Sequence, residues 1–224
     1  MKEQRVEAVE RALSIIECFS ANERELTLTE ISQLTGLYMS TILRLCGSLE
    51  RYGYIVRLST GQFRIGPSLW RLGSLYSQGF EQAEVIRPRL REVVEATKET
   101  ATFYVREGCD RVCLFRETSP QSLRFDLDEG VRLTMERGAS AHVLRAYSKD
   151  ARPEDEVIRQ AGFAISEGER TPNVTAVAVP VLSSGGALRG ALGVSGPSFR
   201  FDAPAKELAL SSLRNAAALL NSHE

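Results

Sequence analysis

Small hydroxyl and cationic side chains recur at helical spacing over residues 39–51. At about 100° per residue, the polar side of this segment collects Ser40, Arg44, Gly47 and Arg51. The opposite side is apolar and is expected to be buried, with Ile42, Leu45, Cys46 and Leu49. A helix with a hydroxyl near its start, an arginine one turn later and a glycine beyond it has the shape and the hydrogen-bonding groups that suit the major groove of DNA.

Two more arginines lie in a hairpin pattern that follows this helix. Residues 54–57 and 62–65 are rich in β-branched and aromatic side chains, and Leu58-Ser59-Thr60-Gly61 between them suits a turn. Arg57 and Arg64 therefore flank the hairpin, where they are placed to contact phosphates. The net charge is only −1, but residues 38–71 hold Arg44, Arg51, Arg57, Arg64 and Arg71 against the single acid Glu50. Positive charge is thus concentrated on these two elements.

A short helix and a tight turn must position the polar helix. Thr27 predicts an N-cap, residues 28–34 have a helical pattern, and Thr35-Gly36 supplies a turn that favours left-handed backbone. The next helix is expected from Leu37 to about Tyr52. Helix, turn, helix and basic hairpin in this order predict a winged helix-turn-helix. The alternative is a surface helix and hairpin of an ordinary α/β domain.

A first helix is expected over residues 5–19, with an unusually wide apolar stripe. The stripe consists of Val6, Val9, Leu13 and Ile16, widened by Ala12, Ile15 and Phe19. Such a width indicates burial on two sides, one against the helix-turn-helix and one against a second copy of the chain. After the hairpin, Gly66-Pro67 predicts the start of a connecting helix that reaches about Gln78, and Gly79 places a boundary near residue 80.

Beyond residue 80 the pattern predicts an α+β domain, an antiparallel sheet flanked by helices. Helices are expected over residues 82–97, 138–148, 154–161 and 203–221. Strands are expected near residues 101–106, 111–117, 163–167, 174–182 and 187–195. Turn-forming residues at 107–110 and 183–186 join neighbouring strands as hairpins.

Two of these strands each have a bulky face and a small-residue face. The small faces carry Ala176, Ala178 and Pro180 on one strand and Ala191, Gly193 and Ser195 on the other. Either a closely packed helix or a ligand must fill the room above them, and both remain open. Residues 137–141 begin a helix with small side chains, whose free backbone N–H groups would accept an anion such as a carboxylate. Together these features predict a pocket with an apolar floor and an anion-accepting rim.

Residues suited to catalysis or metal binding are few. A histidine-dependent site would have to use His142, and residues 193–197 lack the spacing of a nucleophile elbow. The four cysteines, Cys18, Cys46, Cys109 and Cys113, form no Cys-x-x-Cys pair. We therefore expect no catalytic residue, no metal and no cofactor. The lack of a secretory signal or of about 20 consecutive apolar residues predicts a cytoplasmic protein with no membrane partner.

Taken in order, several motifs of the chain resemble the isocitrate lyase regulator (IclR) family of bacterial transcription factors. The N-terminal motifs are Val9-Glu10-Arg11-Ala12-Leu13, Leu26-Thr27-Leu28-Thr29-Glu30-Ile31, Ser40-Thr41-Ile42-Leu43-Arg44-Leu45 and Phe63-Arg64-Ile65-Gly66-Pro67. The C-terminal motifs are Gly168-Glu169, Val177-Ala178-Val179-Pro180-Val181 and Leu192-Gly193-Val194-Ser195-Gly196-Pro197. The resemblance spans nearly the whole chain.

The resemblance implies a winged helix-turn-helix DNA-binding domain over residues 1–66, a linker helix over 67–80 and a GAF-like effector-binding and oligomerisation domain over 81–224. The implied partners are double-stranded operator DNA, a small organic acid effector and further copies of the chain in a homodimer or homotetramer. Contacts to DNA would fall on Ser40, Thr41 and Arg44, with Arg11, Arg57 and Arg64 near the backbone. Contacts to the effector would fall on Phe125, Leu133, Ala139, Ser140, Glu169, Pro180, Gly193 and Ser195.

The sequence departs from the family pattern at the rim of the expected pocket. Thr134-Met135 replaces a common Pro-Leu, and Ala139-Ser140-Ala141-His142 replaces Ala-x-Gly-Lys. These departures bear on which effector binds. Two alternatives remain beside an effector-modulated regulator. One is a ligand-independent DNA-binding protein whose C-terminal domain only oligomerises, and the other is a small-molecule enzyme.

Overall fold

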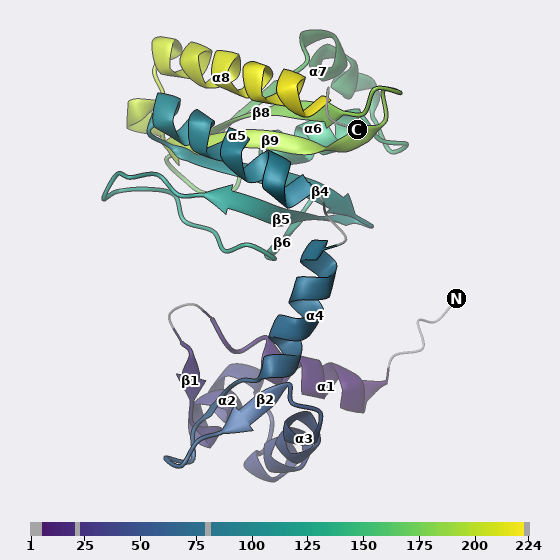
Figure 1. Ribbon diagram of the computed structural model, residues 1–224, viewed down its shortest axis with the longest axis vertical. Coiled ribbons are helices and arrows are strands. Elements are labelled where there is room, and N and C mark those ends of the chain that lie inside the picture. Colours follow the sequence, from purple (N-terminus) through teal and green to yellow (C-terminus); the bar gives the residue numbers. More distant parts are fainter. Residues whose placement is uncertain (1–5, 21–22, 79–81, 222–224) are drawn as a thin grey trace. The chain divides into compact units, whose positions relative to one another are not determined.

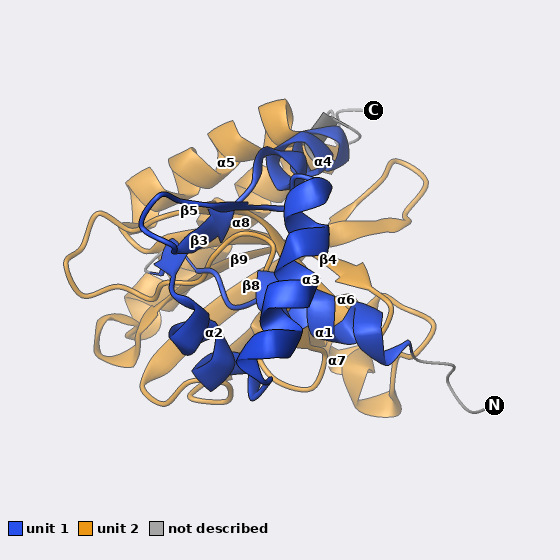
Figure 2. Cartoon of the chain, turned by 90° about the horizontal axis from the view of Figure 1, so that it is seen from below, with its two compact units in different colours: residues 1–80 blue, residues 81–224 orange. Residues whose placement is uncertain are grey.

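The computed structural model describes residues 6–20, 23–78 and 82–221 (Figure 1). The chain divides into two compact units, residues 1–80 and residues 81–224 (Figure 2). The first unit is mainly helical with a small sheet, and the second consists of a larger sheet with helices on both faces. The predicted α+β class is therefore confirmed.

The first unit has the order of a winged helix-turn-helix. Its elements are α1 (Glu7–Ile16), β1 (Glu25–Leu26), α2 (Leu28–Thr35), α3 (Met39–Arg51), β2 (Ile55–Arg57), β3 (Phe63–Ile65) and α4 (Pro67–Gln78). The three strands form an antiparallel sheet in the order β1-β3-β2. The core side chains Ile15, Ile31, Ile42 and Phe63 join α1, α2, α3 and the wing. β1 has only two residues and was not expected from the sequence.

Local hydrogen bonds explain where α2 and α3 begin and end. Thr27 caps α2 through a capping box, in which Glu30 N donates to Thr27 Oγ1 at 3.2 Å and Thr27 N donates to Glu30 Oε2 at 2.7 Å. Gly36 ends α2 with a φ of +70°. The expected start of α3 at Leu37 was wrong, because the Leu37 carbonyl accepts a hydrogen bond from Ser32 Oγ at 2.7 Å and Tyr38 has an extended backbone. α3 therefore begins at Met39.

The second unit is a six-stranded antiparallel sheet in the order β6-β5-β4-β9-β8-β7. Its strands are β4 (Thr100–Glu107), β5 (Asp110–Glu117), β6 (Arg132–Thr134), β7 (Ala164–Glu167), β8 (Val174–Leu182) and β9 (Leu188–Pro197). Its helices are α5 (Gln82–Thr97), α6 (Ala139–Ala146), α7 (Glu156–Ala161) and α8 (Ala203–Asn221), with short 3₁₀ turns η1 (Pro153–Asp155) and η2 (Ser198–Arg200). Helices α5 and α8 pack on one face of the sheet, and α6 packs on the other (Figure 1).

Candidate nucleic-acid interface and ligand pocket

The polar side of α3 is exposed as the sequence pattern predicts. Ile42, Cys46 and Leu49 are buried in the core of the first unit. Ser40, Arg44, Gly47 and Arg51 on the other side are exposed, and Thr41 lies half-buried at the edge. Among the residues that the structure describes, Arg44 and Arg51 take part in no ion pair, so their positive charges are available to an anionic partner.

The arginines of the wing are also exposed. Arg57 and Arg64 lie on β2 and β3, and the hairpin between them closes where Gly61 adopts a φ of +86° and its N–H donates to Leu58 O at 2.9 Å. The Arg57 guanidinium lies 5.6 Å from the centroid of the Phe63 ring, which anchors its stem. Arg11 instead forms an ion pair with Glu7 on α1. The wing, which follows α3 along the chain, therefore presents two positively charged side chains to solvent.

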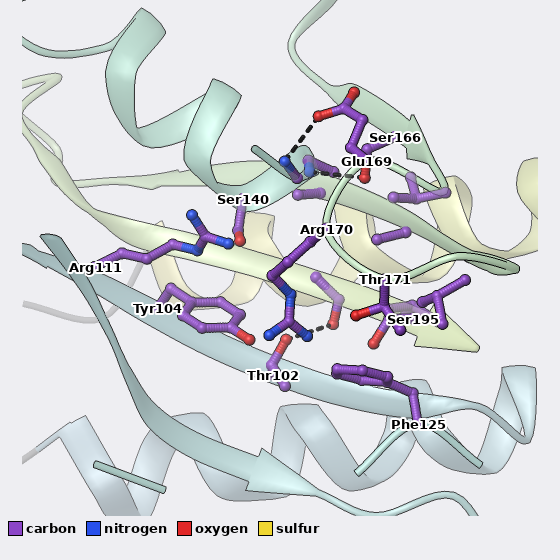
Figure 3. Close-up of a pocket in the computed structure, with 18 residues that line it drawn as sticks. Thr102, Tyr104, Arg111, Phe125, Ser140, Ser166, Glu169, Arg170, Thr171 and Ser195 are labelled. Carbon is purple, nitrogen blue, oxygen red and sulfur yellow. Dashed lines mark hydrogen bonds between the residues drawn. The ribbon is translucent and has the colours of Figure 1, made fainter. Parts of the chain in front are cut away.

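A pocket of about 500 Å³, part of it open to solvent, lies on the α6 side of the large sheet (Figure 3). Its floor is made by the small-residue faces of β8 and β9, since Ala178 pairs with Gly193 and Ala176 pairs with Ser195. Next to the pocket, Ala191 of β9 packs in one core cluster with Ala139 and Val143 of α6, and Ala178 belongs both to this cluster and to the pocket lining. Of the two possibilities left open by the sequence, a closely packed helix is present, because α6 covers part of the small-residue face, and the pocket over the rest leaves room for a ligand.

Two arginines from different elements reach the pocket. Arg111 on β5 is only 2% exposed, and its Nη2 donates to Arg137 O at 2.9 Å. It also bonds to the carbonyl of Thr134, and its guanidinium lies 5.6 Å from the centroid of the Tyr104 ring. Its buried Nε has no hydrogen-bond partner within the described part of the chain. Burial, reinforced by the nearby charge of Arg170, lowers the pKa of Arg111.

Arg170 approaches the same space from the connection between β7 and β8. Its guanidinium lies 4.7 Å from the centroid of the Phe125 ring, and both residues line the pocket. The segment carrying Phe125 is held to the sheet, because Thr100 Oγ1 donates to the Phe125 carbonyl at 3.0 Å. Hydroxyls of Thr102, Tyr104 and Ser195 lie nearby in the lining (Figure 3). The pocket therefore combines an aromatic wall, several hydroxyls and two cations.

The expectation that the start of α6 offers free N–H groups to a ligand holds only in part, because the first two of these groups are bonded within the chain. Gly138 N donates to Glu169 Oε2 at 2.8 Å, and Ala139 N donates to Ser166 Oγ at 3.0 Å. Glu169 Oε2 also lies 2.7 Å from His142 Nε2. Burial is the largest effect on the pKa of Glu169 and raises it, but the Gly138 N–H and the His142 ring together outweigh burial and lower that pKa. A carboxylate of the chain itself thus occupies the helix start.

Six of the eight residues predicted for the effector line the pocket, namely Phe125, Ala139, Ser140, Glu169, Gly193 and Ser195. Leu133 on β6 lies outside this lining, half-buried against the core beside α6, and Pro180 lies half-buried on β8 opposite Ala191. The sequence analysis missed several lining residues: Thr102, Tyr104, Arg111, Ser166, Arg170 and Thr171. The strand pattern could have indicated Arg111, because it lies two residues from Cys113 and therefore on the same face of β5.

A winged helix-turn-helix with exposed arginines, joined to an α+β unit with a pocket, defines a DNA-binding transcriptional regulator. The model of the IclR helix-turn-helix domain matches residues 8–59, and that of the bacterial transcriptional regulator IclR C-terminal domain matches residues 154–221. The chain belongs to the IclR family. Members of this family are transcriptional regulators and not enzymes, which contradicts the alternative of a small-molecule enzyme.

Similar proteins cover most of the chain. The regulator BhcR of Paracoccus denitrificans is 28% identical over 221 residues, which cover 87% of this chain and 79% of the relative. The regulator XynR of Escherichia coli is 26% identical over 223 residues, covering 88% of each protein. The crystal structure of an IclR regulator from Alicyclobacillus acidocaldarius has a TM-score of 0.78 at 21% identity, covering 97% of this chain and 98% of that one.

A second solved structure is an IclR homologue from Microbacterium hydrocarbonoxydans in complex with 4-hydroxybenzoate. It has a TM-score of 0.75 at 21% identity and covers 96% of this chain and 100% of that chain. At this identity the likeness establishes the shared fold. Within the described residues, none of the helices has both the length and the apolar character needed to cross a bilayer.

Proposed function

We propose that this protein is a sequence-specific regulator whose affinity for its operator changes when a small organic acid binds in the pocket of the second unit. The observation that carries the proposal is Arg111, whose buried guanidinium lines the pocket and whose Nε has no hydrogen-bond partner among the residues that the structure describes. A buried donor without a partner costs free energy, and a planar carboxylate is the group that guanidinium donors bind best. Arg170 adds a second positive charge beside it.

The aromatic wall narrows the class of acid. Phe125 and Tyr104 line the pocket together with the two arginines. A ring or a short apolar chain would fill the space between the aromatic wall and the small-residue floor. The structural neighbour from Microbacterium hydrocarbonoxydans holds 4-hydroxybenzoate, a carboxylic acid with a ring. This supports the same class of effector here, bound by its carboxylate at the arginines, since Glu169 already occupies the start of α6.

On the DNA side, we assign base contacts to Ser40, Thr41 and Arg44 on α3. Phosphate contacts fall to Arg57 and Arg64 on the wing and to Arg11 on α1. The exposure of the α3 and wing residues supports this assignment, apart from the half-buried Thr41. Arg11 would have to leave its ion pair with Glu7 to reach a phosphate.

The protein is further proposed to act in the cytoplasm as a homodimer or homotetramer. Val9 and Leu13 of α1 are exposed, although their apolar stripe predicts burial on two sides. Trp70 and Leu75 of α4 are exposed as well. A second copy of the chain covering these helices would remove this apolar surface from water.

Effector control then follows from linkage. An acid that binds one arrangement of the oligomer more tightly than another shifts the population of that arrangement, and with it the spacing of the two α3 helices. Couplings of this kind are typically about 1–3 kcal/mol, which corresponds to a change of about 5- to 150-fold in DNA affinity.

The test has two parts. Isothermal titration calorimetry with a panel of aromatic and short-chain carboxylic acids identifies a binder, and DNA titrations with and without that acid measure the coupling. The same titrations are repeated with Arg170→Gln. Because Arg170 is exposed, removing its guanidinium leaves the core intact. We expect the acid to bind Arg170→Gln more weakly and to shift its DNA affinity less at equal acid concentration. If no acid in the panel binds, or if an acid binds without changing DNA affinity, the result would favour a ligand-independent DNA-binding protein.

A further inference from the structure

The exposed side of α3 carries an apolar ridge beside its polar one. Met39 and Leu43 lie four residues apart on the helix and are 45% and 42% exposed. The same ridge continues through Gly47 to Arg51, while Ser40 and Arg44 form the neighbouring polar ridge. Neither Met39 nor Leu43 belongs to the hydrophobic core of the first unit. A contact with another molecule would remove these two apolar side chains from water.

Gly47 interrupts this ridge, because it has no side chain. A Cβ atom built on Gly47 would meet no atom within 4 Å, so nothing in the described part of the unit requires a glycine there. Glycine in a helix interior is destabilising compared with alanine, because it loses more conformational freedom on folding. Its lack of a side chain leaves a notch at which another molecule can approach the backbone of α3.

We infer that Met39 and Leu43 form an apolar edge that packs on thymine methyl groups in the major groove, and that Gly47 lets this edge come close to the base pairs. The inference rests on the proposed function, in which α3 enters the major groove. Thymine presents a C5 methyl group there, and the other groups that the four bases present in that groove are polar donors and acceptors. Ser40 and Arg44 are suited to those polar groups, whereas Met39 and Leu43 are not.

The charges beside the ridge favour DNA over a second copy of the chain as the molecule that covers it. Arg51 continues the apolar ridge and Arg44 flanks it, and within the described residues neither forms an ion pair. A protein surface seated on Met39 and Leu43 would have to neutralise both guanidinium groups. The phosphates that border the major groove do this while the apolar ridge faces the bases.

The experiment uses the full chain and DNA duplexes selected from a randomised library. Each thymine of the preferred site is then replaced, one at a time, by deoxyuridine, which removes only the methyl group. Where the edge contacts a methyl, we expect binding to the wild-type protein to weaken about fourfold for each methyl removed. This penalty should disappear in Leu43→Ala or in Met39→Ala. Leu208→Ala, which truncates a similarly exposed leucine on α8, is the control and should keep it.

The possible failures are distinguishable. If the wild-type protein enriches no sequence, the proposed sequence-specific function itself fails, and this inference fails with it. If a preferred site emerges but contains no thymine that is sensitive to deoxyuridine, the proposed function stands and the apolar edge is refuted. A deoxyuridine penalty that persists unchanged in both Met39→Ala and Leu43→Ala would also refute it, because another residue would then read the methyl.

Discussion

Asp155 is the side chain whose removal we expect to destabilise the second unit most selectively. It is fully buried in η1, and its carboxylate accepts hydrogen bonds from Arg145 Nε at 2.9 Å and Arg145 Nη2 at 2.7 Å. It also accepts a hydrogen bond from Arg152 N at 2.9 Å. Arg145 lies on α6, the helix whose start lines the pocket. This ion pair therefore fastens α6 to the segment that follows it.

The expected magnitude follows from the burial of the pair. Asp155→Ala leaves the Arg145 guanidinium without its counter-ion, and removing one partner of a buried pair costs about 3–5 kcal/mol. This is a large part of the about 5–15 kcal/mol that stabilises a typical domain. Asp150→Ala is the matched control, since Asp150 lies five residues earlier, is 67% exposed and pairs with Arg106 at the surface. Exposed pairs contribute about 1 kcal/mol or less.

The single tryptophan of the chain separates the two units in a urea titration. Trp70 lies on α4 in the first unit, so its fluorescence reports the unfolding of that unit, whereas circular dichroism reports both. For Asp155→Ala we expect part of the circular dichroism change to move to lower urea while the fluorescence midpoint stays in place. Equal shifts for Asp155→Ala and Asp150→Ala would refute the reasoning, and so would a shift confined to the fluorescence.

Five further outcomes are expected. The Arg145 ion pair lowers the pKa of Asp155, so its stabilisation is present above the ordinary carboxyl pKa of about 3.9 and is lost as the pH falls below it. The stability difference between wild type and Asp155→Asn should therefore shrink during acid titration, and a constant difference would contradict this. Gly47→Ala should stabilise the first unit by about 0.5–1 kcal/mol and weaken DNA binding, whereas Gly73→Ala, where a Cβ also meets open space, should stabilise it without weakening DNA binding. Equal DNA affinity of the two variants would contradict the close approach at Gly47. Arg111→Met should weaken binding of the effector acid about 10- to 150-fold in calorimetry, as expected for losing a hydrogen bond to a charged group, and unchanged affinity would exclude Arg111 as its anchor. Gly190→Ala should destabilise the second unit by about 1–3 kcal/mol and so lower its urea midpoint, because the new Cβ would clash with Phe103 Cζ and lie 2.6 Å from the Tyr104 carbonyl oxygen; an unchanged midpoint would contradict this clash. Arg44→Ala should lose site preference and Arg64→Ala should flatten the salt dependence in DNA titrations, while identical behaviour of both would contradict their separate roles.

Much of the fold could be predicted because its signals are local. The capping box of Thr27, the left-handed Gly36 and the helical periodicity of α5 and α8 are all read from neighbouring residues. The short strands β1 and β6 were missed for the opposite reason. Each has two or three residues and exists only because a distant strand pairs with it, as Leu26 does with Phe63 and Arg132 with Val112. Periodicity cannot detect elements this short, and β1 and β6 lack the adjacent hairpin turn that marks the equally short β2 and β3.

The pocket was predicted where strand alternation determines it and missed where distant groups meet. Gly193 and Ser195 follow from the small-residue face of β9. The capping of α6 by Glu169 could not be predicted, because it joins residues 31 positions apart through one carboxylate. The residues Arg111 and Arg170 also come from separate elements, and only the folded sheet brings both to one cavity.

The position that we propose for the acid-binding groups follows from the hydrogen bonds that the start of α6 already makes within the chain. A helix start attracts a carboxylate through its N–H groups and its partial positive charge, and here Glu169 supplies that carboxylate from within the chain. An effector that competed for this position would have to displace Glu169 and leave it buried without its Gly138 and His142 contacts. Arg111 carries a donor with no such competitor. We therefore expect the proposed effector carboxylate to gain most at Arg111 on β5 and at Arg170 in the connection between β7 and β8.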